Sequence, residues 1–307
     1  MTKIIFIVGP TAVGKTEAAC FLAKKINAEI ISCDSMQIYK GMDILTAKPS
    51  IALRKKIPHY LIDEISPSKE YNVAAYRKKA LSKIKSIIKK GKTPIFVGGT
   101  GLYVNMLVDG IFDVKTEDED VRKKLYSLAD KKGSAYLYDK LRKNDPQAAR
   151  KIHPNDTRRI VRALEVLEVT GKPITELQKA RKGLSAEFDI DIFCLDMDRS
   201  ALYRRIDSRV DGMFKSGLIK EVKGLLKKRL SKTASCAIGI KEIKGYLDGS
   251  YDLDEAKRLV RRNSRWYAKR QLTWFRKDKR IIWIPVKDKQ TPQKTAKEIY
   301  KTWKEHS

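Results

Sequence analysis

Short apolar runs alternate with amphipathic segments along the first hundred residues. Lys3–Val8, Glu29–Cys33 and Pro94–Val97 are strand-like, whereas Lys15–Ile26 and Val73–Lys90 have the spacing of helices. Apolar strands that alternate with helices are typical of a parallel sheet with helices on both faces. The pattern therefore predicts an α/β fold.

The middle of the chain has a different pattern, with almost no strand-like run. Ile160 and Leu164 recur there at helical spacing, in one of several helical segments. We therefore expect a helical insertion over residues 115–191. It would interrupt a catalytic core formed by residues 1–114 and 192–307.

The turn after the first predicted strand matches the phosphate-binding pattern G-x-x-x-x-G-K-[ST]. The matching residues are Gly9, Pro10, Thr11, Ala12, Val13, Gly14, Lys15 and Thr16. In such a loop the backbone N–H groups face an anion at the N-terminus of a helix. Lys15 can neutralise terminal phosphate oxygens, and the Thr16 hydroxyl can ligate Mg²⁺. This P-loop predicts a diphosphate or triphosphate site.

A metal-holding aspartate is absent from the position where conventional P-loop NTPases carry it, at the end of a later apolar strand. Here the run Pro94–Val97 ends in Gly98-Gly99-Thr100-Gly101. The sequence therefore favours binding of a phosphate chain over its hydrolysis.

Asp34 and Thr100 each come just after a predicted strand. Ligands of open α/β sheets bind beyond the carboxyl ends of the strands, so we expect both residues at the edge that carries the P-loop. A carboxylate there can accept a proton from a nucleophile or hold a metal through water. The alternative for Asp34 is a cap or turn residue.

Seven motifs over nearly the whole chain give it a resemblance to the bacterial tRNA dimethylallyltransferases, also called tRNA isopentenyltransferases. They are GPTAVGKT at Gly9–Thr16, DSMQIYKGMDI at Asp34–Ile44, TAKP at Thr46–Pro49, VGGTGLY at Val97–Tyr103, HPND at His153–Asp156, RRIVRALEV at Arg158–Val166 and KRQLTWFR at Lys269–Arg276. Members of this family transfer a dimethylallyl group from dimethylallyl diphosphate to the N6 amine of the adenosine 3′ of the anticodon. Leu45 and Ile240 depart from the family pattern, which usually has Gly and Tyr there.

The resemblance implies roles for the residues already named. The P-loop, with Lys15, Thr16 and Mg²⁺, would bind the diphosphate leaving group and neutralise its charge. Asp34 would accept the proton from the adenine amine. The base, extruded from the anticodon-loop stack, would be faced by Asp34, Ser35, Met36, Gln37 and Thr100.

Positive charge is in large excess, because 66 Lys and Arg residues stand against 37 Asp and Glu residues, a net charge of +29. Such a balance favours polyanionic partners. The segment Lys257–Arg280 holds eleven basic residues and one acidic residue. If it is helical, one face gathers Arg258, Arg262, Arg265, Lys269 and Arg276. This stripe is either a solvated face or a phosphate-binding surface, and we expect Lys269 and Arg276 to contact tRNA.

Arg270 falls on the apolar side of the same predicted helix, between Trp266 and Trp274. A guanidinium there needs a partner. Our hypothesis is that Arg270 lines a channel near the donor diphosphate; an ion pair inside the core is the alternative. The helical spacing of the two tryptophans favours core packing over stacking on bases.

The predicted insertion carries a second basic patch. By resemblance this segment contacts the anticodon stem-loop of tRNA, and the residues expected to do so are Arg122, Arg158, Arg159, Ile160, Val161 and Arg162.

Two other functions stay open at this point: an adenylate isopentenyltransferase that modifies a free nucleotide, and a P-loop NTPase that binds RNA. The basic insertion argues against the first, and the absent strand-end aspartate argues against the second. The longest apolar runs are too short to span a bilayer. We therefore expect a cytoplasmic enzyme with no membrane partner. We also expect it to be a monomer.

Overall fold

The computed structural model describes residues 2–111 and 117–306. The chain divides into two compact units. One consists of Met1–Val108 with Glu187–Ser307, and the other of Asp109–Ala186. Each unit has its own hydrophobic core.

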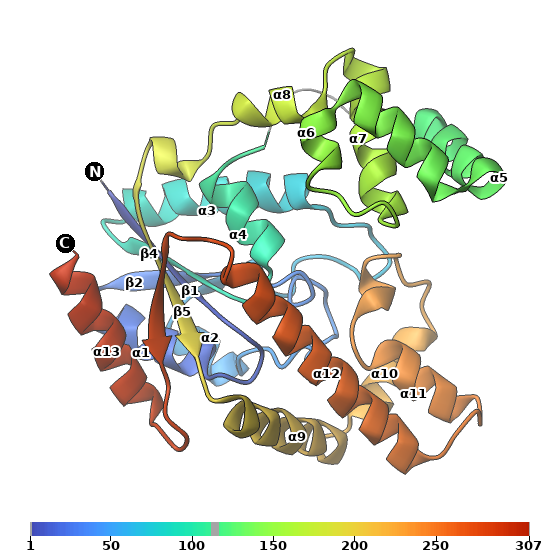
Figure 1. Cartoon of the computed structure of the whole chain (residues 1–307). Helices are drawn as coiled ribbons and strands as arrows, with labels where there is room; N and C mark the ends of the chain where they lie inside the picture. Colours follow the sequence, from blue (N-terminus) through green and yellow to red (C-terminus); the bar gives the residue numbers. More distant parts are fainter. Residues whose placement is uncertain (1, 112–116, 307) are drawn as a thin grey trace. The chain divides into compact units, whose positions relative to one another are not determined.

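The first unit is built on a six-stranded sheet in the order β3-β2-β4-β1-β5-β6 (Figure 1). The strands are β1 (Lys3–Val8), β2 (Ala28–Ser32), β3 (His59–Tyr60), β4 (Thr93–Val97), β5 (Asp189–Asp196) and β6 (Ile281–Pro285). Every neighbouring pair is parallel. This confirms the α/β fold with a parallel sheet that the sequence predicts.

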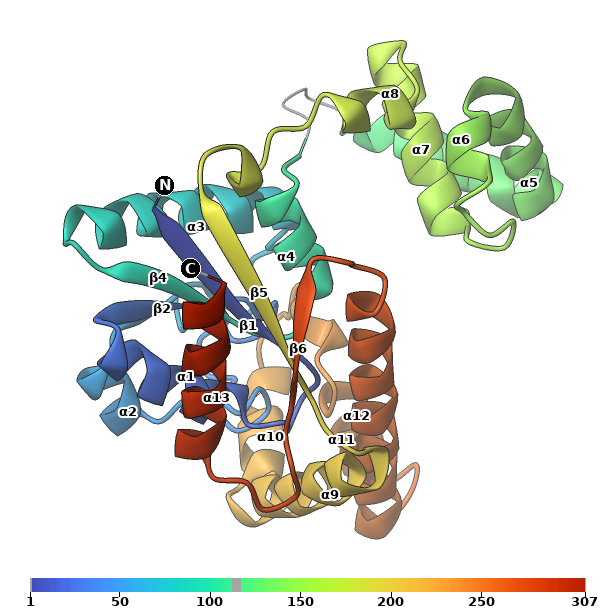
Figure 2. The same cartoon turned by 60° about the vertical axis from the view of Figure 1, so that its left-hand side comes forward.

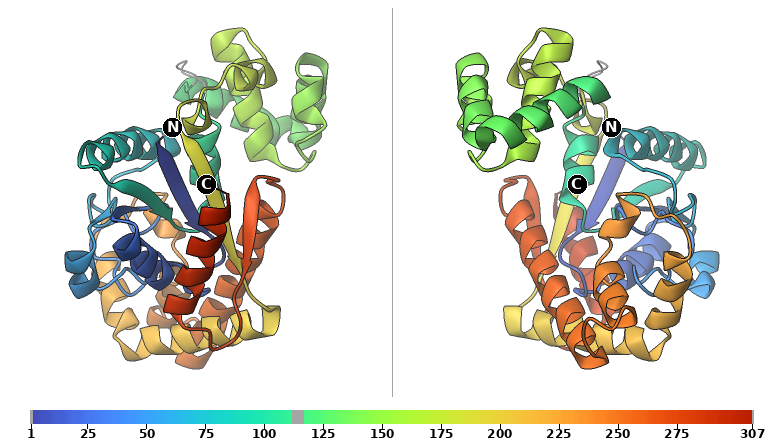
Figure 3. Two further views of the ribbon diagram at one scale, coloured as in Figure 1. Left: turned by 90° about the vertical axis from the view of Figure 1, so that its left-hand side faces the viewer. Right: turned by 90° about the vertical axis from the view of Figure 1, so that its right-hand side faces the viewer.

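Helices cover both faces of this sheet because its strands are apolar on both sides (Figure 2). The helices of this unit are α1 (Lys15–Lys25), α2 (Ile51–Lys56), α3 (Val73–Lys89), α4 (Gly101–Val108), α9 (Arg199–Lys215), α10 (Leu218–Leu226), α11 (Ile240–Leu247), α12 (Leu253–Phe275) and α13 (Pro292–Glu305), of which α1, α3 and α13 pack directly on the strands. Ile5, Ile7 and Ile95 pack under α1 and α13, which lie side by side (Figure 3). On the other face, Phe6 stacks on Phe96 with ring centroids 4.6 Å apart.

The second unit is helical. Its helices are α5 (Glu119–Asn144), α6 (Pro146–Ala149), α7 (Thr157–Thr170) and α8 (Ile174–Lys179). Gly133 interrupts α5 with a φ of 83° and a ψ of 159°, a conformation that glycine adopts at little steric cost. Leu125, Leu137 and Leu141 of α5 pack on Ile160 and Leu164 of α7. The periodic apolar positions of the middle segment thus form the core of this unit.

No helix in the described part of the chain combines the length and the hydropathy that crossing a bilayer requires.

Candidate active site

The P-loop lies between the end of β1 and the start of α1, and two of its glycines are required by the backbone. Gly9 has a φ of +136°, and a Cβ there would lie 2.6 Å from the carbonyl oxygen of Leu195 on β5. Gly14 caps α1 in the left-handed conformation with a φ of 98°. This geometry directs the first turn of α1 towards the sheet edge where β2 and β4 also end.

Lys15 is enclosed at the start of α1. Its Nζ donates a hydrogen bond to the carbonyl oxygen of Pro10 at 2.6 Å. Burial, followed by the positive charge of Arg209, lowers the pKa of Lys15 to about 8, and Asp34 acts in the opposite direction. An incoming anion stabilises the protonated form of Lys15, because its negative charge offsets both the burial and the repulsion by Arg209.

Arg209 reaches the same place from α9. Its Nη1 donates to Oγ1 of Thr11 at 3.1 Å, and burial lowers the pKa of this guanidinium. None of the described carboxylates lies within ion-pair distance of it. Two enclosed cations, Lys15 and Arg209, therefore flank the loop, which is the arrangement that a diphosphate needs.

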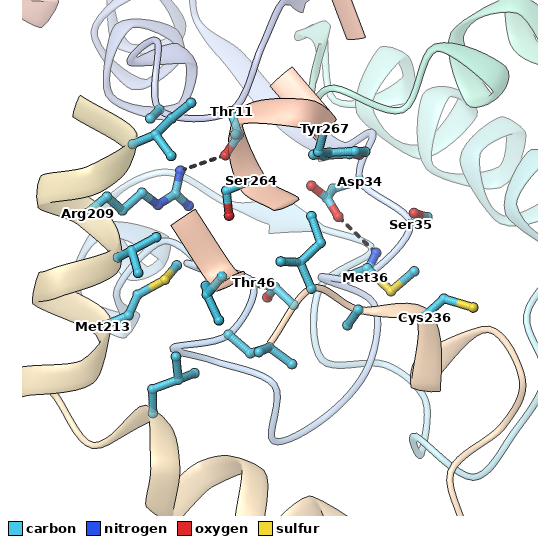
Figure 4. Close-up of a pocket in the computed structure, with 18 of the residues that line it drawn as sticks. Thr11, Asp34, Ser35, Met36, Thr46, Arg209, Met213, Cys236, Ser264 and Tyr267 are labelled. Atoms are coloured by element: carbon cyan, nitrogen blue, oxygen red, sulfur yellow. Dashed lines mark hydrogen bonds between the residues drawn. The ribbon is translucent and has the colours of Figure 1, made fainter. Parts of the chain in front are cut away.

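Two adjoining cavities meet at this point. They share Thr11, Asp34, Thr46, Arg209 and Tyr267 in their lining (Figure 4). One is polar and is also lined by Lys15, Thr16, Ser32 and Gln37. The other has a largely apolar wall, formed by Ile206, Val210, Met213, Leu218, Ile238 and Val260. The site can thus hold a charged group and an apolar group side by side.

Asp34 lies at the junction of the two cavities. Its Oδ1 accepts hydrogen bonds from the backbone N–H groups of Met36 at 2.8 Å and Gln37 at 3.4 Å. The other oxygen is turned into the cavity (Figure 4). The turn role and the functional role are therefore compatible, because each uses a different oxygen.

Ser35, Gln37 and Thr100 surround Asp34, but two of them are engaged within the protein. The Oγ1 of Thr100 accepts from the backbone N–H of Ser35 at 3.1 Å. Gln37 accepts from the Ser32 hydroxyl at 2.9 Å and donates to the carbonyl oxygen of Thr46 at 3.4 Å. Ser35 and Met36 line the apolar-walled cavity, whereas Thr100 is not in the lining of either cavity and holds the turn through Ser35.

Gln271 on α12 joins the P-loop to the glycine-rich loop after β4. Its Oε1 accepts from the backbone N–H of Thr11 at 2.9 Å, and its Nε2 donates to the carbonyl oxygen of Gly99 at 3.0 Å. The side chain is buried, and a Cβ at Gly99 would lie 1.9 Å from Nε2. The N–H of Thr11 is consequently occupied and does not face the cavity as a phosphate donor.

Glu221 on α10 holds a second wall of the site. Its carboxylate accepts from three consecutive backbone N–H groups, those of Asp43 at 3.0 Å, Ile44 at 2.8 Å and Leu45 at 2.8 Å. The next residue is Thr46, which lines both cavities. Leu45, one of the departures from the family pattern, is buried here.

The sequence motifs did not reveal the roles of Arg209, Gln271 and Glu221. Arg209 and Glu221 lie outside the quoted motifs on helices with several charged residues. Gln271 lies within KRQLTWFR, and a polar residue on the apolar side of that helix is the one signal that could have marked it.

Arg270 lines the apolar-walled cavity and is exposed. Its guanidinium carbon lies 5.8 Å from the centroid of the Tyr267 ring. The alternative of an ion pair inside the core is therefore wrong. Core packing is also wrong for Trp266, which is 52% exposed, whereas Trp274 packs against Gly101, where a Cβ would lie 2.2 Å from the indole.

The predicted basic stripe on α12 is partly neutralised by the protein itself. Arg265 is paired with Asp207, with Nε 2.9 Å from Oδ1, and Arg258 is paired with Glu255. Lys269 and Arg276 are exposed. The surface that can meet phosphates is therefore narrower than the sequence suggests.

In the helical unit, the structure separates the expected RNA contacts into two groups. Ile160 and Val161 are buried in the core, so the expectation that their side chains contact tRNA is wrong. Arg122 and Arg162 pair with buried Glu165, at 3.0 Å and 2.9 Å. Arg158 and Arg159 are exposed, and Arg159 lies 3.3 Å from Asp156.

The sequence around this site matches a known protein family and several of its members. The IPP transferase family model matches residues 37–278. The tRNA dimethylallyltransferase of Carboxydothermus hydrogenoformans is 51% identical over 92% of this chain and 91% of its own length. That of Alkaliphilus oremlandii is 45% identical over 99% of this chain and 98% of its own.

Solved structures of related proteins point to the same family. The crystal structure of the full-length tRNA isopentenylpyrophosphate transferase from Bacillus halodurans is 41% identical, covers 100% of both chains and has a TM-score of 0.71. A eukaryotic dimethylallyltransferase acting on tRNA is 31% identical over 94% of this chain and 75% of its own, with a TM-score of 0.80. This chain is a transferase that belongs to the tRNA dimethylallyltransferase, or IPP transferase, family.

Proposed function

We propose that this transferase moves the dimethylallyl group of dimethylallyl diphosphate to N6 of the adenosine at tRNA position 37, directly 3′ of the anticodon, giving N6-isopentenyladenosine. One observation carries the proposal: Asp34 lies where a polar cavity with two enclosed cations meets an apolar-walled cavity. A prenyl diphosphate has this same division between a charged end and an apolar end.

The diphosphate is held at the N-terminus of α1 by Lys15 and Arg209. Both cations are enclosed and positioned before the substrate arrives, so little reorganisation is needed when the C–O bond breaks. Preorganised charge of this kind stabilises the leaving group as negative charge develops on its oxygens. Gly9, Pro10, Ala12 and Val13 complete the loop, and Arg270 contributes a further cation at the cavity wall.

Mg²⁺ fits the oxygen donors that this site offers. The Thr16 hydroxyl and the Asp34 carboxylate line the same polar cavity, and the described residues contain no cluster of three metal-binding side chains. Mg²⁺ takes one or two protein ligands together with phosphate oxygens and water. We propose that Thr16 holds the ion together with the diphosphate, where it neutralises charge on the leaving group.

Asp34 accepts the proton. As N6 attacks the first carbon of the dimethylallyl group, the bond from that carbon to the diphosphate oxygen breaks and pyrophosphate leaves. The nitrogen then carries an extra proton, which passes to the oxygen of Asp34 that faces the cavity. The hydrogen bonds from Met36 and Gln37 to Oδ1 keep the carboxylate oriented.

The tRNA anticodon stem-loop is bound through exposed cations. The exposed candidates are Lys269 on α12, Arg276 directly after α12, and Arg158 and Arg159 on α7. Arg122 and Arg162 keep part of their side chains accessible beside Glu165. We propose that the enzyme acts as a cytoplasmic monomer.

The test is a transfer assay with labelled dimethylallyl diphosphate and Mg²⁺, in which unmodified tRNA, AMP and ATP are offered in parallel. Label should appear in tRNA alone and should be lost when guanosine replaces the target adenosine. Label in AMP would instead identify an adenylate isopentenyltransferase. Phosphate released from ATP without prenyl transfer would identify an NTPase.

A further inference from the structure

The exposed indole of Trp266 on α12 has no part in the site described above. At 52% exposure it is the most exposed aromatic side chain among the described residues. Tryptophan normally buries much of its large apolar surface. Its presentation to solvent on a basic helix points to a ligand for the ring.

Trp266 lies on the helix that forms one wall of the apolar-walled cavity, outside the cavity lining itself. Ser264, Tyr267 and Arg270 of α12 line this cavity. Trp266 precedes Arg270 by four residues, about one helical turn, so the two side chains follow each other along one face. An RNA loop that places a base in the cavity and runs along α12 past Arg270 meets the indole.

One face of the indole is already covered by a cation. The guanidinium carbon of Arg262, one turn earlier, lies 4.8 Å from the ring centroid, within the range of a cation–π contact. The remaining exposure leaves ring surface for a second planar group. A nucleobase on that side would complete a stack of guanidinium, indole and base.

We propose that Trp266 is the stacking platform for the unpaired nucleotide next to the target adenosine in the anticodon loop. This inference rests on the proposed function. Extrusion of the target base removes a stacking partner from its neighbour. An aromatic side chain one helical turn from Arg270 at the cavity wall replaces that partner, as is usual in the recognition of single-stranded RNA.

The surroundings of Trp266 favour RNA over a protein partner. Its helical neighbours Arg262, Lys269 and Arg270 are all cationic. The cores of protein interfaces are depleted in charged residues, particularly lysine, whereas loop phosphates on either side of a stacked base match such neighbours.

The experiment compares Trp266→Ala and Trp266→Phe with a control, Phe21→Ala, which removes an exposed aromatic from α1. We expect Trp266→Ala to raise the KM for an anticodon stem-loop RNA about tenfold. The kcat and the KM for dimethylallyl diphosphate should change less than about twofold, since Trp266 is outside the cavity lining. Trp266→Phe should retain most of the affinity, and Phe21→Ala should match the wild type.

The stacked nucleotide is identified by making it abasic, on each side of the target in turn. At the correct position, Trp266→Ala should add no further loss, because the stack is already absent. An unchanged stem-loop KM in a folded Trp266→Ala protein would overturn the proposal. So would a larger effect on the donor KM than on the RNA KM.

A binding assay separates this inference from the proposed function. Titration with the stem-loop should quench tryptophan fluorescence in the wild type, and most of the quenching should disappear in Trp266→Phe. If quenching is observed but no label reaches tRNA, the proposed function fails while the stacking site stands. If transfer occurs and Trp266→Phe quenches like the wild type, the stacking site fails alone.

Discussion

The positive charges of the P-loop region are free of ion pairs with described carboxylates, whereas many of those on the basic helices α7 and α12 are paired. Lys15 and Arg209 are enclosed, and neither forms an ion pair with a described carboxylate. On the basic helices, Arg265 is paired with Asp207 and Arg162 with buried Glu165. An anion that reaches Lys15 and Arg209 is attracted by both charges in full, whereas an anion that reaches Arg265 or Arg162 must compete with a carboxylate.

This difference shows why a count of basic residues overstates an RNA-binding surface. Exposed ion pairs contribute little to stability, but they lower the net charge that phosphates meet. The stronger candidates are therefore Lys269 on α12, Arg276 at its C-terminal end, and Arg158 on α7. We propose that the enclosed cations, in contrast, bind one small anion, the donor diphosphate.

The largest expected effect is that of Asp34→Asn, which removes the proposed proton acceptor at the junction of the two cavities. The rate of the chemical step should fall about 10²–10⁴-fold, the usual contribution of a general base. Single-turnover transfer to tRNA measures this rate, and filter binding should give an unchanged tRNA affinity. A retained rate would assign the proton to another acceptor.

A matched pair of arginine variants tests the comparison itself. Arg209→Gln should lower kcat/KM for dimethylallyl diphosphate about 100-fold, because an enclosed cation on the leaving group is lost. Arg265→Gln removes a cation that is already paired, and should change this value less than about twofold. Equal effects from both variants would show that pairing does not decide which cations act on the donor.

The pKa of Lys15 gives a pH dependence to the same region. Because burial lowers this pKa to about 8, kcat/KM for the donor should fall above that pH, about tenfold per unit, as Lys15 loses its proton. Bound diphosphate stabilises the protonated form, so kcat should hold to higher pH. In Lys15→Arg the decline near pH 8 should disappear, and a decline that persists there belongs to another group.

The smallest expected effect concerns salt. The logarithm of the stem-loop affinity should fall linearly with the logarithm of salt concentration, and Lys269→Ala should reduce this slope by about one unit. Arg265→Ala should leave the slope nearly unchanged, because its charge is held by Asp207. Binding titrations at several salt concentrations measure both slopes. A shallower slope in Arg265→Ala would mean that RNA displaces the internal pair.

The parts of the site that the sequence predicted are those in which backbone geometry fixes residue type. Gly9 and Gly14 need conformations or contacts that other residues do not tolerate, and Asp34 follows directly from the end of a strand. Arg209 and Glu221 reach the site only because α9 and α10 pack beside it, which depends on tertiary contacts.

The roles of basic and aromatic residues at the surface were harder to predict, because they too depend on tertiary contacts. A basic residue looks the same in the sequence whether it faces solvent or a carboxylate on another helix. Arg122 and Arg162 lie 43 and three residues from Glu165, and their convergence depends on how α5 packs on α7. Trp266 has the spacing of a core residue and yet is exposed, since the cations on either side of it keep that face of α12 solvated.

The amide of Gln271 has a mechanical consequence. One buried side chain ties the P-loop and the loop after β4 to a 23-residue helix whose outer face carries Trp266 and Lys269. A displacement of α12 would therefore move the hydrogen-bond partner of Thr11 and that of Gly99 together. If α12 binds RNA as proposed, that contact is linked to both loops by a single hydrogen-bonded amide.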